Sequence, residues 1–168
     1  MDEYQEQAIE WACQKIMRQY YQHVDRYEYE EAIMLFTPDV DWLGLGVKLD
    51  GRKQILEGLY GGLGGGTIRH MLTNVVVEVI DADHAKASAY NTLYSSPDIR
   101  YDQQSGPIDF KTATQVVEQR DEFTRTLDGW RISKRRGEAV FKRDPDELIP
   151  LHSWAVDEGR MATKMQLK

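Results

Sequence analysis

Apolar residues in the first part of the chain recur at spacings of three and four, the period of an amphipathic helix. They are Ala8, Ile9, Ala12, Ile16, Met17, Tyr20 and Val24. This pattern predicts a helix over residues 3–25, with Asp2 as its N-cap. A second helix is expected over residues 28–36, because Pro38 disfavours helical geometry at Thr37.

The pattern then predicts a short strand over residues 39–42 and a third helix over 51–60, with Asp50 as its cap. A glycine-rich run over residues 61–66 follows that helix. It lacks the Lys-Ser/Thr of a P-loop and does not follow a strand, so a nucleotide site is not expected. We interpret it as a helix-to-strand connection.

The second half of the chain has a composition typical of β-strands. It is rich in β-branched residues and contains two turn signals, at 81–83 and at Asp128-Gly129. The expected strands are 68–80, 84–95, 108–126 and 130–142. Helices early and strands late predict an α+β fold, in which a cone-shaped, curved antiparallel sheet wraps around the N-terminal helices. The domain is expected to span 1–143, with 144–168 as a docked or partly disordered tail.

The strand over residues 68–80 carries apolar side chains on both faces if it alternates regularly. One face would hold His70, Leu72, Asn74 and Val76, and the other Met71, Val75, Val77 and Val79. The helices can cover only one face of the sheet. A homodimer or homotrimer is therefore expected to cover the other.

Composition and charge exclude several classes of protein. The 168 residues suit one domain, and a formal net charge of -7 argues against nucleic acid as a partner. No apolar run approaches the roughly 18 residues of a membrane span, and the polar start is not a signal peptide. The single cysteine, Cys13, favours a reducing, cytoplasmic location. Neither paired histidines at ligand spacing nor a CxxC motif is present, so no metal and no cofactor are expected.

One of the four histidines, His70, begins a strongly apolar strand, so its side chain is expected to point into an enclosed space. Asp25 lies near the end of the first predicted helix, where the helix dipole disfavours a carboxylate. His70 could supply the compensating donor, and a carboxylate on one ring nitrogen makes the other a better base. Two alternatives remain open: His70 as a structural residue, and Asp25 as the opening of the next turn beside Arg26.

Five collinear stretches resemble SnoaL-like proteins of the nuclear transport factor 2-like superfamily. They are 20–25, 32–42, 51–55, 67–74 and 128–136. The resemblance covers roughly residues 5–143 and implies a cone-shaped α+β barrel.

The resemblance also implies roles for particular residues. Dehydratases and a dehydrochlorinase of this group pair an aspartate at the end of the first helix with a histidine on the following long strand, and those roles fall on Asp25 and His70. A third catalytic role falls on Tyr20, and Trp42 stands where scytalone dehydratase has a tyrosine. The second histidine of that enzyme has no counterpart in the strand around 90–96.

Trp42 and three further residues are expected to bind substrate. Tyr90, like Tyr20, is a candidate hydrogen-bond partner for a substrate oxygen. Lys134, Arg135 and Arg136 are consecutive, so alternation separates Arg135 from its two neighbours. Either Arg135 or Arg136 is expected to reach the pocket as a partner for an anion or oxyanion, and strand phase leaves the choice open.

Together these observations favour a lyase of the dehydratase type that removes a proton from a small apolar or cyclic substrate. An isomerase or a polyketide-cyclase-like enzyme is a neighbouring alternative. A non-catalytic role, as the β subunit of an aromatic-ring dioxygenase or as a ligand-binding protein, belongs to a different class.

Overall fold

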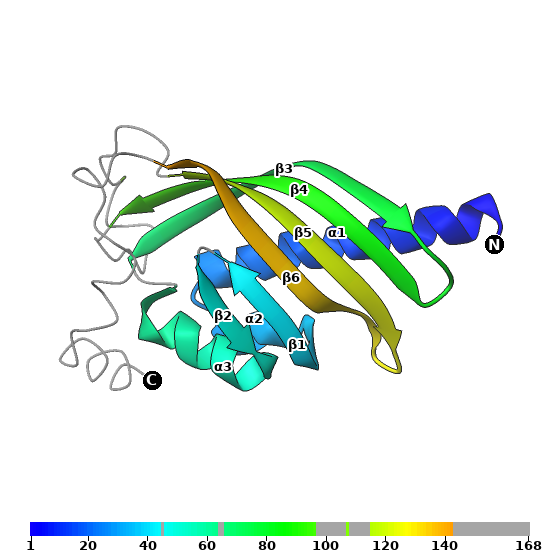
Figure 1. Ribbon diagram of the computed structural model, residues 1–168, viewed down its shortest axis with the longest axis horizontal. Helices are drawn as coiled ribbons and strands as arrows, with labels where there is room; N and C mark the ends of the chain where they lie inside the picture. Colours follow the sequence, from blue (N-terminus) through cyan, green and yellow to red (C-terminus); the bar gives the residue numbers. More distant parts are fainter. Residues whose placement is uncertain (45, 64–65, 97–106, 108–114, 143–168) are drawn as a thin grey trace.

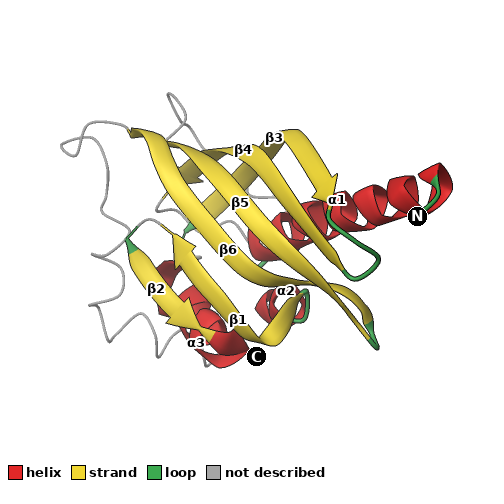
Figure 2. Ribbon diagram, turned by 45° about the vertical axis from the view of Figure 1, so that its right-hand side comes forward, coloured by secondary structure: helices red, strands yellow, loops and turns green. Residues whose placement is uncertain are grey.

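The computed structural model describes residues 1–44, 46–63, 66–96, 107 and 115–142. Its helices are α1 (Glu3–Asp25), α2 (Tyr29–Ile33), α3 (Gly51–Gly58) and a π-helical turn, η1 (Leu59–Leu63). Its strands are β1 (Phe36–Gly44), β2 (Val47–Asp50), β3 (Thr67–Val79), β4 (His84–Ser96), β5 (Gln115–Thr126) and β6 (Gly129–Lys142). They form one curved sheet in the order β2-β1-β6-β5-β4-β3, with α1 along one of its faces (Figures 1 and 2).

The predicted first helix is confirmed at both ends. Asp2 accepts a hydrogen bond from the backbone N–H of Gln5 at 2.8 Å, and the Gln5 side chain accepts one from the N–H of Asp2 at 3.2 Å. This capping box satisfies donors that the first turn leaves free. The buried stripe of the helix packs on the sheet and comprises Ile9, Cys13, Ile16, Met17, Tyr20, Tyr21 and Val24.

The second and third helices differ from the prediction. α2 ends at Ile33, and the expected helical residue Phe36 instead opens β1, where it is fully buried and pairs with Ile132 of β6. This long-range pairing overrides the local preference. Asp50 precedes α3 without a side-chain cap bond, and its backbone N–H donates to Gln54 Oε1 at 2.9 Å instead.

The sheet is mixed, because β1 runs parallel to β6 and all other described pairings are antiparallel. The strand β2 was not predicted. The α+β fold class, with a curved sheet against the N-terminal helices, is confirmed. The tail 144–168 and the expected strand residues 108–114 lie outside the described residues. Across the described part of the chain, no helix combines the length and apolarity needed to span a membrane.

A bulge in β3 explains the two apolar faces of that strand. Its register with β4 shifts between Thr73 and Val76, and Asn74 has a φ of 51°. The bulge changes the phase of the strand, so His70 and Leu72 face inward before it and Val75, Val77 and Val79 face inward after it. The predicted assignment of side chains to the two faces was wrong here. Met71 and Val76 still lie exposed on the outer face, at 50% and 64%, and the homodimer or homotrimer stays a prediction.

Candidate active site

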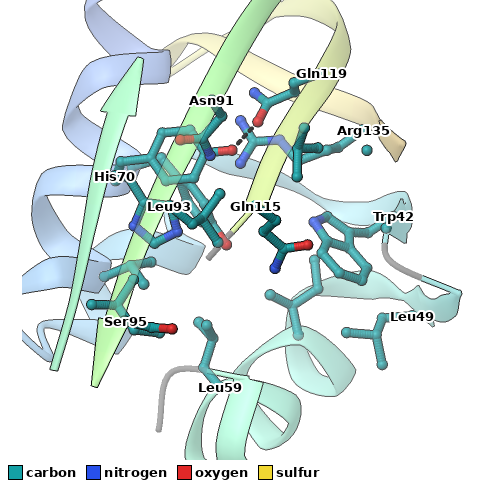
Figure 3. Close-up of a pocket in the computed structure, with 18 residues that line it drawn as sticks. Trp42, Leu49, Leu59, His70, Asn91, Leu93, Ser95, Gln115, Gln119 and Arg135 are labelled. Atoms are coloured by element: carbon teal, nitrogen blue, oxygen red, sulfur yellow. Dashed lines mark hydrogen bonds between the residues drawn. The ribbon is translucent and has the colours of Figure 1, made fainter. Parts of the chain in front are cut away.

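A cavity of about 110 Å³ lies between the last turns of α1, the inner face of the sheet, and α3 with η1. Its walls are mostly apolar, with Val24, Leu49, Ile55, Leu59, Ile68, Leu93 and Val117 among them. Polar side chains reach it from α1 and from five strands (Figure 3). This combination of an apolar lining with a few placed polar groups is typical of small-molecule sites.

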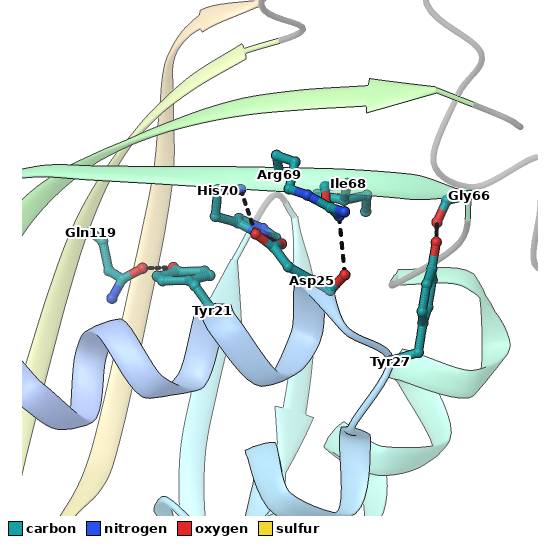
Figure 4. Close-up of polar contacts among 8 residues, drawn as sticks. All are labelled: Tyr21, Asp25, Tyr27, Gly66, Ile68, Arg69, His70 and Gln119. Carbon is teal, nitrogen blue, oxygen red and sulfur yellow. Dashed lines mark hydrogen bonds and ion pairs between the residues drawn. The ribbon is translucent and has the colours of Figure 1, made fainter. Parts of the chain in front are cut away.

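The structure brings Asp25 and His70 into direct contact, although they are far apart in the sequence (Figure 4). Asp25 is the last residue of α1, and His70 lies in the first part of β3. Its Nδ1 lies 2.6 Å from Asp25 Oδ1, and its backbone N–H donates to Asp25 Oδ2 at 3.0 Å. Both side chains are largely buried, at 9% exposure for His70 and 14% for Asp25.

This contact has a chemical consequence. A proton on Nδ1 is held by the carboxylate, which leaves Nε2 of His70 as the nitrogen able to accept a proton. The imidazole lines the cavity, so the arrangement can act as a general base on a bound molecule. The two hydrogen bonds that His70 donates also offset the unfavourable interaction between the Asp25 carboxylate and the negative end of the α1 dipole.

Two further hydrogen bonds fix the end of α1 to the start of β3. Arg69 Nη1 donates to the backbone carbonyl of Asp25 at 3.1 Å, and Tyr27 Oη donates to the carbonyl of Gly66 at 3.0 Å (Figure 4). The spacing between Asp25 and His70 is therefore held by hydrogen bonds from side chains to backbone carbonyls on both sides.

Tyr21 supports the other side of the histidine. Its ring stacks on His70, with centroids 4.4 Å apart and an interplanar angle of 30°, and its hydroxyl donates to Gln119 Oε1. Gln119 Nε2 in turn donates to Asp121 Oδ2 at 2.9 Å. Burial raises the pKa of Tyr21, against the opposing effect of Arg135, so its side chain stays a neutral phenol.

Arg135 reaches the inner end of the cavity in a buried ion pair. Its Nε and Nη2 donate to the two oxygens of Asp121 at 2.8 and 2.7 Å, and the two side chains are 3% and 0% exposed. Burial lowers the pKa of Arg135, but Asp121 and the neighbouring tyrosines outweigh it and raise the pKa overall. The guanidinium carbon lies 4.2 Å from the centre of the Tyr20 ring.

The structure separates the predicted site residues into two groups. Tyr20, Trp42 and Arg135 line the cavity together with His70. Tyr90 and Arg136 instead lie on the outer face of the sheet, where Tyr90 is 46% exposed and Arg136 pairs with Asp41. Alternation explains this correction, because each is one residue away from a residue of the cavity wall, Asn91 or Arg135.

The sequence prediction missed four polar residues of the site: Asn91, Gln115, Gln119 and Asp121. The last three alternate along β5 with outward side chains, as a solvated strand face would. The available signal was the burial expected beside apolar Val117 and Phe123 on the same face. Among the described residues, no group of three or more His, Cys, Asp or Glu side chains is placed to hold a metal ion.

A curved sheet packed on a long helix, with a cavity at one end, defines the class of cystatin-like folds found in nuclear transport factor 2-like proteins. One such protein from Novosphingobium aromaticivorans superposes with a TM-score of 0.64 at 19% identity, over 85% of this chain and 86% of that one. The model of the SnoaL-like domain matches residues 5–136. The chain therefore belongs to the SnoaL-like family.

Two other similar structures are named as a dehydratase and a dehydrochlorinase. A candidate scytalone dehydratase from Novosphingobium aromaticivorans has a TM-score of 0.66 and 15% identity, over 83% of this chain and 89% of that chain. Hexachlorocyclohexane dehydrochlorinase from Novosphingobium barchaimii has a TM-score of 0.66 and 14% identity, over 88% and 97%. At these identities the likeness concerns the fold. No protein of curated function matches the chain.

Proposed function

We propose that the protein is a lyase in which His70 removes a proton from a carbon beside a carbonyl group and a neighbouring hydroxyl group leaves as water. The observation that carries this proposal is the contact between Asp25 and His70 at the cavity wall. Asp25 orients the imidazole and stabilises the imidazolium form that appears once the proton has been taken.

The proposed step balances without an oxidant, a reductant or a second substrate. His70 Nε2 takes the proton, and the electron pair of the broken C–H bond forms a double bond to the neighbouring carbon. The C–O bond at that carbon breaks, and the departing oxygen takes the proton back from the imidazolium. Water leaves, and His70 returns to its neutral form.

Negative charge develops on the carbonyl oxygen while the proton is removed, and a preorganised donor lowers the barrier most when it points at that oxygen. We assign this role to Arg135, which lines the same cavity as His70. Tyr20, which packs its ring under the guanidinium, is then a positioning residue for Arg135. Burial raises the pKa of Tyr20, so its hydroxyl stays protonated at neutral pH.

Two further facts support an elimination. The cavity wall is mostly apolar, which strengthens electrostatic interactions with the reacting atoms. Two structures of the same fold carry names, dehydratase and dehydrochlorinase, that denote removal of a small molecule from a substrate.

The proposal is tested with a panel of small cyclic hydroxy ketones, with formation of the conjugated ketone followed by ultraviolet absorbance. We expect His70→Ala and Asp25→Asn each to lower kcat about 10²- to 10⁴-fold, the usual contribution of a general base. His84→Ala is the matched control, since His84 Nδ1 also contacts an aspartate, Asp81, but is 57% exposed. Turnover that is unchanged in both site variants would refute the mechanism.

A second measurement separates elimination from isomerisation. A hydroxy ketone that is incubated with the protein in deuterium oxide should exchange its α proton for deuterium and also lose water. Exchange without loss of water would overturn the lyase assignment while leaving His70 as the base.

A further inference from the structure

Three residues of the cavity each keep one buried polar atom without a hydrogen-bond partner among the described residues. They are Nη1 of Arg135, Nε1 of Trp42 and Oδ1 of Asn91. The first two atoms are donors and the third is an acceptor. A buried group left unpaired costs free energy, which a bound molecule with matching groups recovers.

The strands place these atoms in a definite pattern. Trp42 of β1 and Arg135 of β6 are register partners on adjacent strands, so the two donors are neighbours on one wall. Asn91 is on β4, the strand next to the one that carries His70, and His70 pairs with Leu93 two residues further along it (Figure 3). The acceptor therefore belongs to the wall that holds the base, and the two donors belong to the wall formed by β1 and β6.

The close fit of Trp42 against its own strand supports its part in this pattern. A Cβ atom added at Gly44 would lie 3.0 Å from two atoms of the Trp42 indole, so the ring lies over the glycine. Gly44 and its register partner Gly137 both line the cavity. The absence of side chains there leaves room for the indole along the wall.

The charges around the cavity do not suit an ionic ligand. The Arg135 guanidinium is already paired with Asp121, so its Nη1 group offers hydrogen bonds rather than an unbalanced charge. Asp25 adds a second carboxylate beside the cavity, which disfavours an anion. A cation would meet two donors on the other wall and an apolar lining, so its burial is disfavoured too.

The volume limits the size of the ligand. A buried apolar cavity of about 150 Å³ accommodates benzene. The cavity of about 110 Å³ is smaller, which limits the ligand to a single small ring.

We propose that the cavity selects a neutral, single-ring hydroxy ketone: its carbonyl oxygen accepts from Arg135 and Trp42, and its hydroxyl group donates to Asn91. This specificity rests on the proposed function, because it presents the carbon beside the carbonyl group to His70. Arg135 and Trp42 then face the oxygen on which negative charge develops, and Asn91 holds the hydroxyl group that leaves.

The test is a binding series of ring compounds of equal size, measured by ligand-observed NMR in the millimolar range. The probes are 3-hydroxycyclohexanone, cyclohexanone, cyclohexanecarboxylate and cyclohexylammonium. We expect 3-hydroxycyclohexanone to bind best and both charged rings to bind at least about tenfold more weakly than cyclohexanone. A charged ring that binds as well as cyclohexanone would overturn the proposal.

Two variants test the individual contacts. Trp42→Phe keeps an aromatic ring and removes the N–H, and it should weaken cyclohexanone binding about tenfold. Asn91→Leu should reduce the affinity for 3-hydroxycyclohexanone to that for cyclohexanone. Unchanged affinities in both variants would overturn the assignment.

Repeating the series in His70→Ala separates this proposal from the proposed function. If the order of affinities is the same and neither the wild type nor any variant turns over the hydroxy ketone, the ligand class is supported and the lyase chemistry is refuted. Turnover of 3-hydroxycyclohexanone that depends on His70, together with a charged ring that binds as well as cyclohexanone, would support the lyase chemistry and refute the ligand class.

Discussion

Asp25 binds His70 through both of its carboxylate oxygens, one to the imidazole and one to the backbone N–H. The ring is held on its other side by the stacked Tyr21. Two of the freedoms that a histidine normally keeps, the choice of tautomer and the rotation of the ring, are thereby restricted. A general base gains from such positioning, because the geometry of proton transfer is in place before the substrate arrives.

Cys13 shows how strongly the same interior resists charge. The side chain is fully buried, and burial, followed by the nearby Asp121 carboxylate, raises its pKa to about 12. An unfolded cysteine titrates near pH 8.5. Above that pH the unfolded chain releases a proton that the folded chain keeps, so the stability is complete below about pH 8 and falls as the pH rises.

We therefore expect the free energy of unfolding of the wild type to fall faster with pH than that of Cys13→Ala. The difference in slope should be about 1 kcal/mol per pH unit between about pH 9 and 10.5, in urea denaturation at a series of pH values. The substitution changes the stability at neutral pH as well, but only the slopes are compared. Parallel curves would show that the thiol ionises equally in both states.

At the scale of elements, the β3 bulge sets which side chains face the cavity. Asn74 adopts a positive φ of 51°, a conformation that asparagine tolerates and a β-branched residue does not. Asn74→Val should destabilise the protein by about 1–3 kcal/mol, whereas Asn74→Gly should change little. Thr73→Val, at the neighbouring regular position, is the control. Equal denaturation midpoints for Asn74→Val and Thr73→Val would contradict this account.

The elements that sequence periodicity predicts well are those stabilised by local interactions. α1 has a capping box and a regular apolar stripe, so both ends were predicted. The strand β1 was predicted over residues 39–42, but its start was mispredicted because Phe36 is held by pairing with Ile132, almost a hundred residues away. The bulge at Asn74 was also missed, because an asparagine in a strand pattern does not by itself indicate that the alternation of inward and outward side chains shifts by one residue.

The same distinction applies to the site. Asp25 and His70 were identifiable because each stands in a place that its residue type normally avoids, a helix C-terminus and an apolar strand. Gln119 and Asp121 occupy alternate positions of a strand, which looks the same whether that face meets solvent or a cavity. Their role depends on which face the helix covers, a property of the assembled fold.

At the scale of the whole molecule, the ion pair of Arg135 and Asp121 connects stability with the proposed function. Removing one partner of a buried pair leaves the other charge uncompensated, and Arg135→Met should destabilise the protein by about 3–5 kcal/mol. Replacing both, with Arg135→Met and Asp121→Leu together, should recover most of that loss, because two well-packed apolar side chains need no partner.

The double variant should nevertheless fail to bind cyclohexanone, since the donor at the inner end of the cavity is gone. Arg136→Met is the matched control: its partner Asp41 is on the outer face, and losing a partly exposed pair should cost less than about 1 kcal/mol and leave binding intact. Urea denaturation and NMR titration on the same four proteins decide the matter. A double variant as unstable as Arg135→Met would mean that the pair holds the fold together. A stable double variant that no longer binds the ketone would mean that the buried ion pair is needed for ligand binding and not for folding.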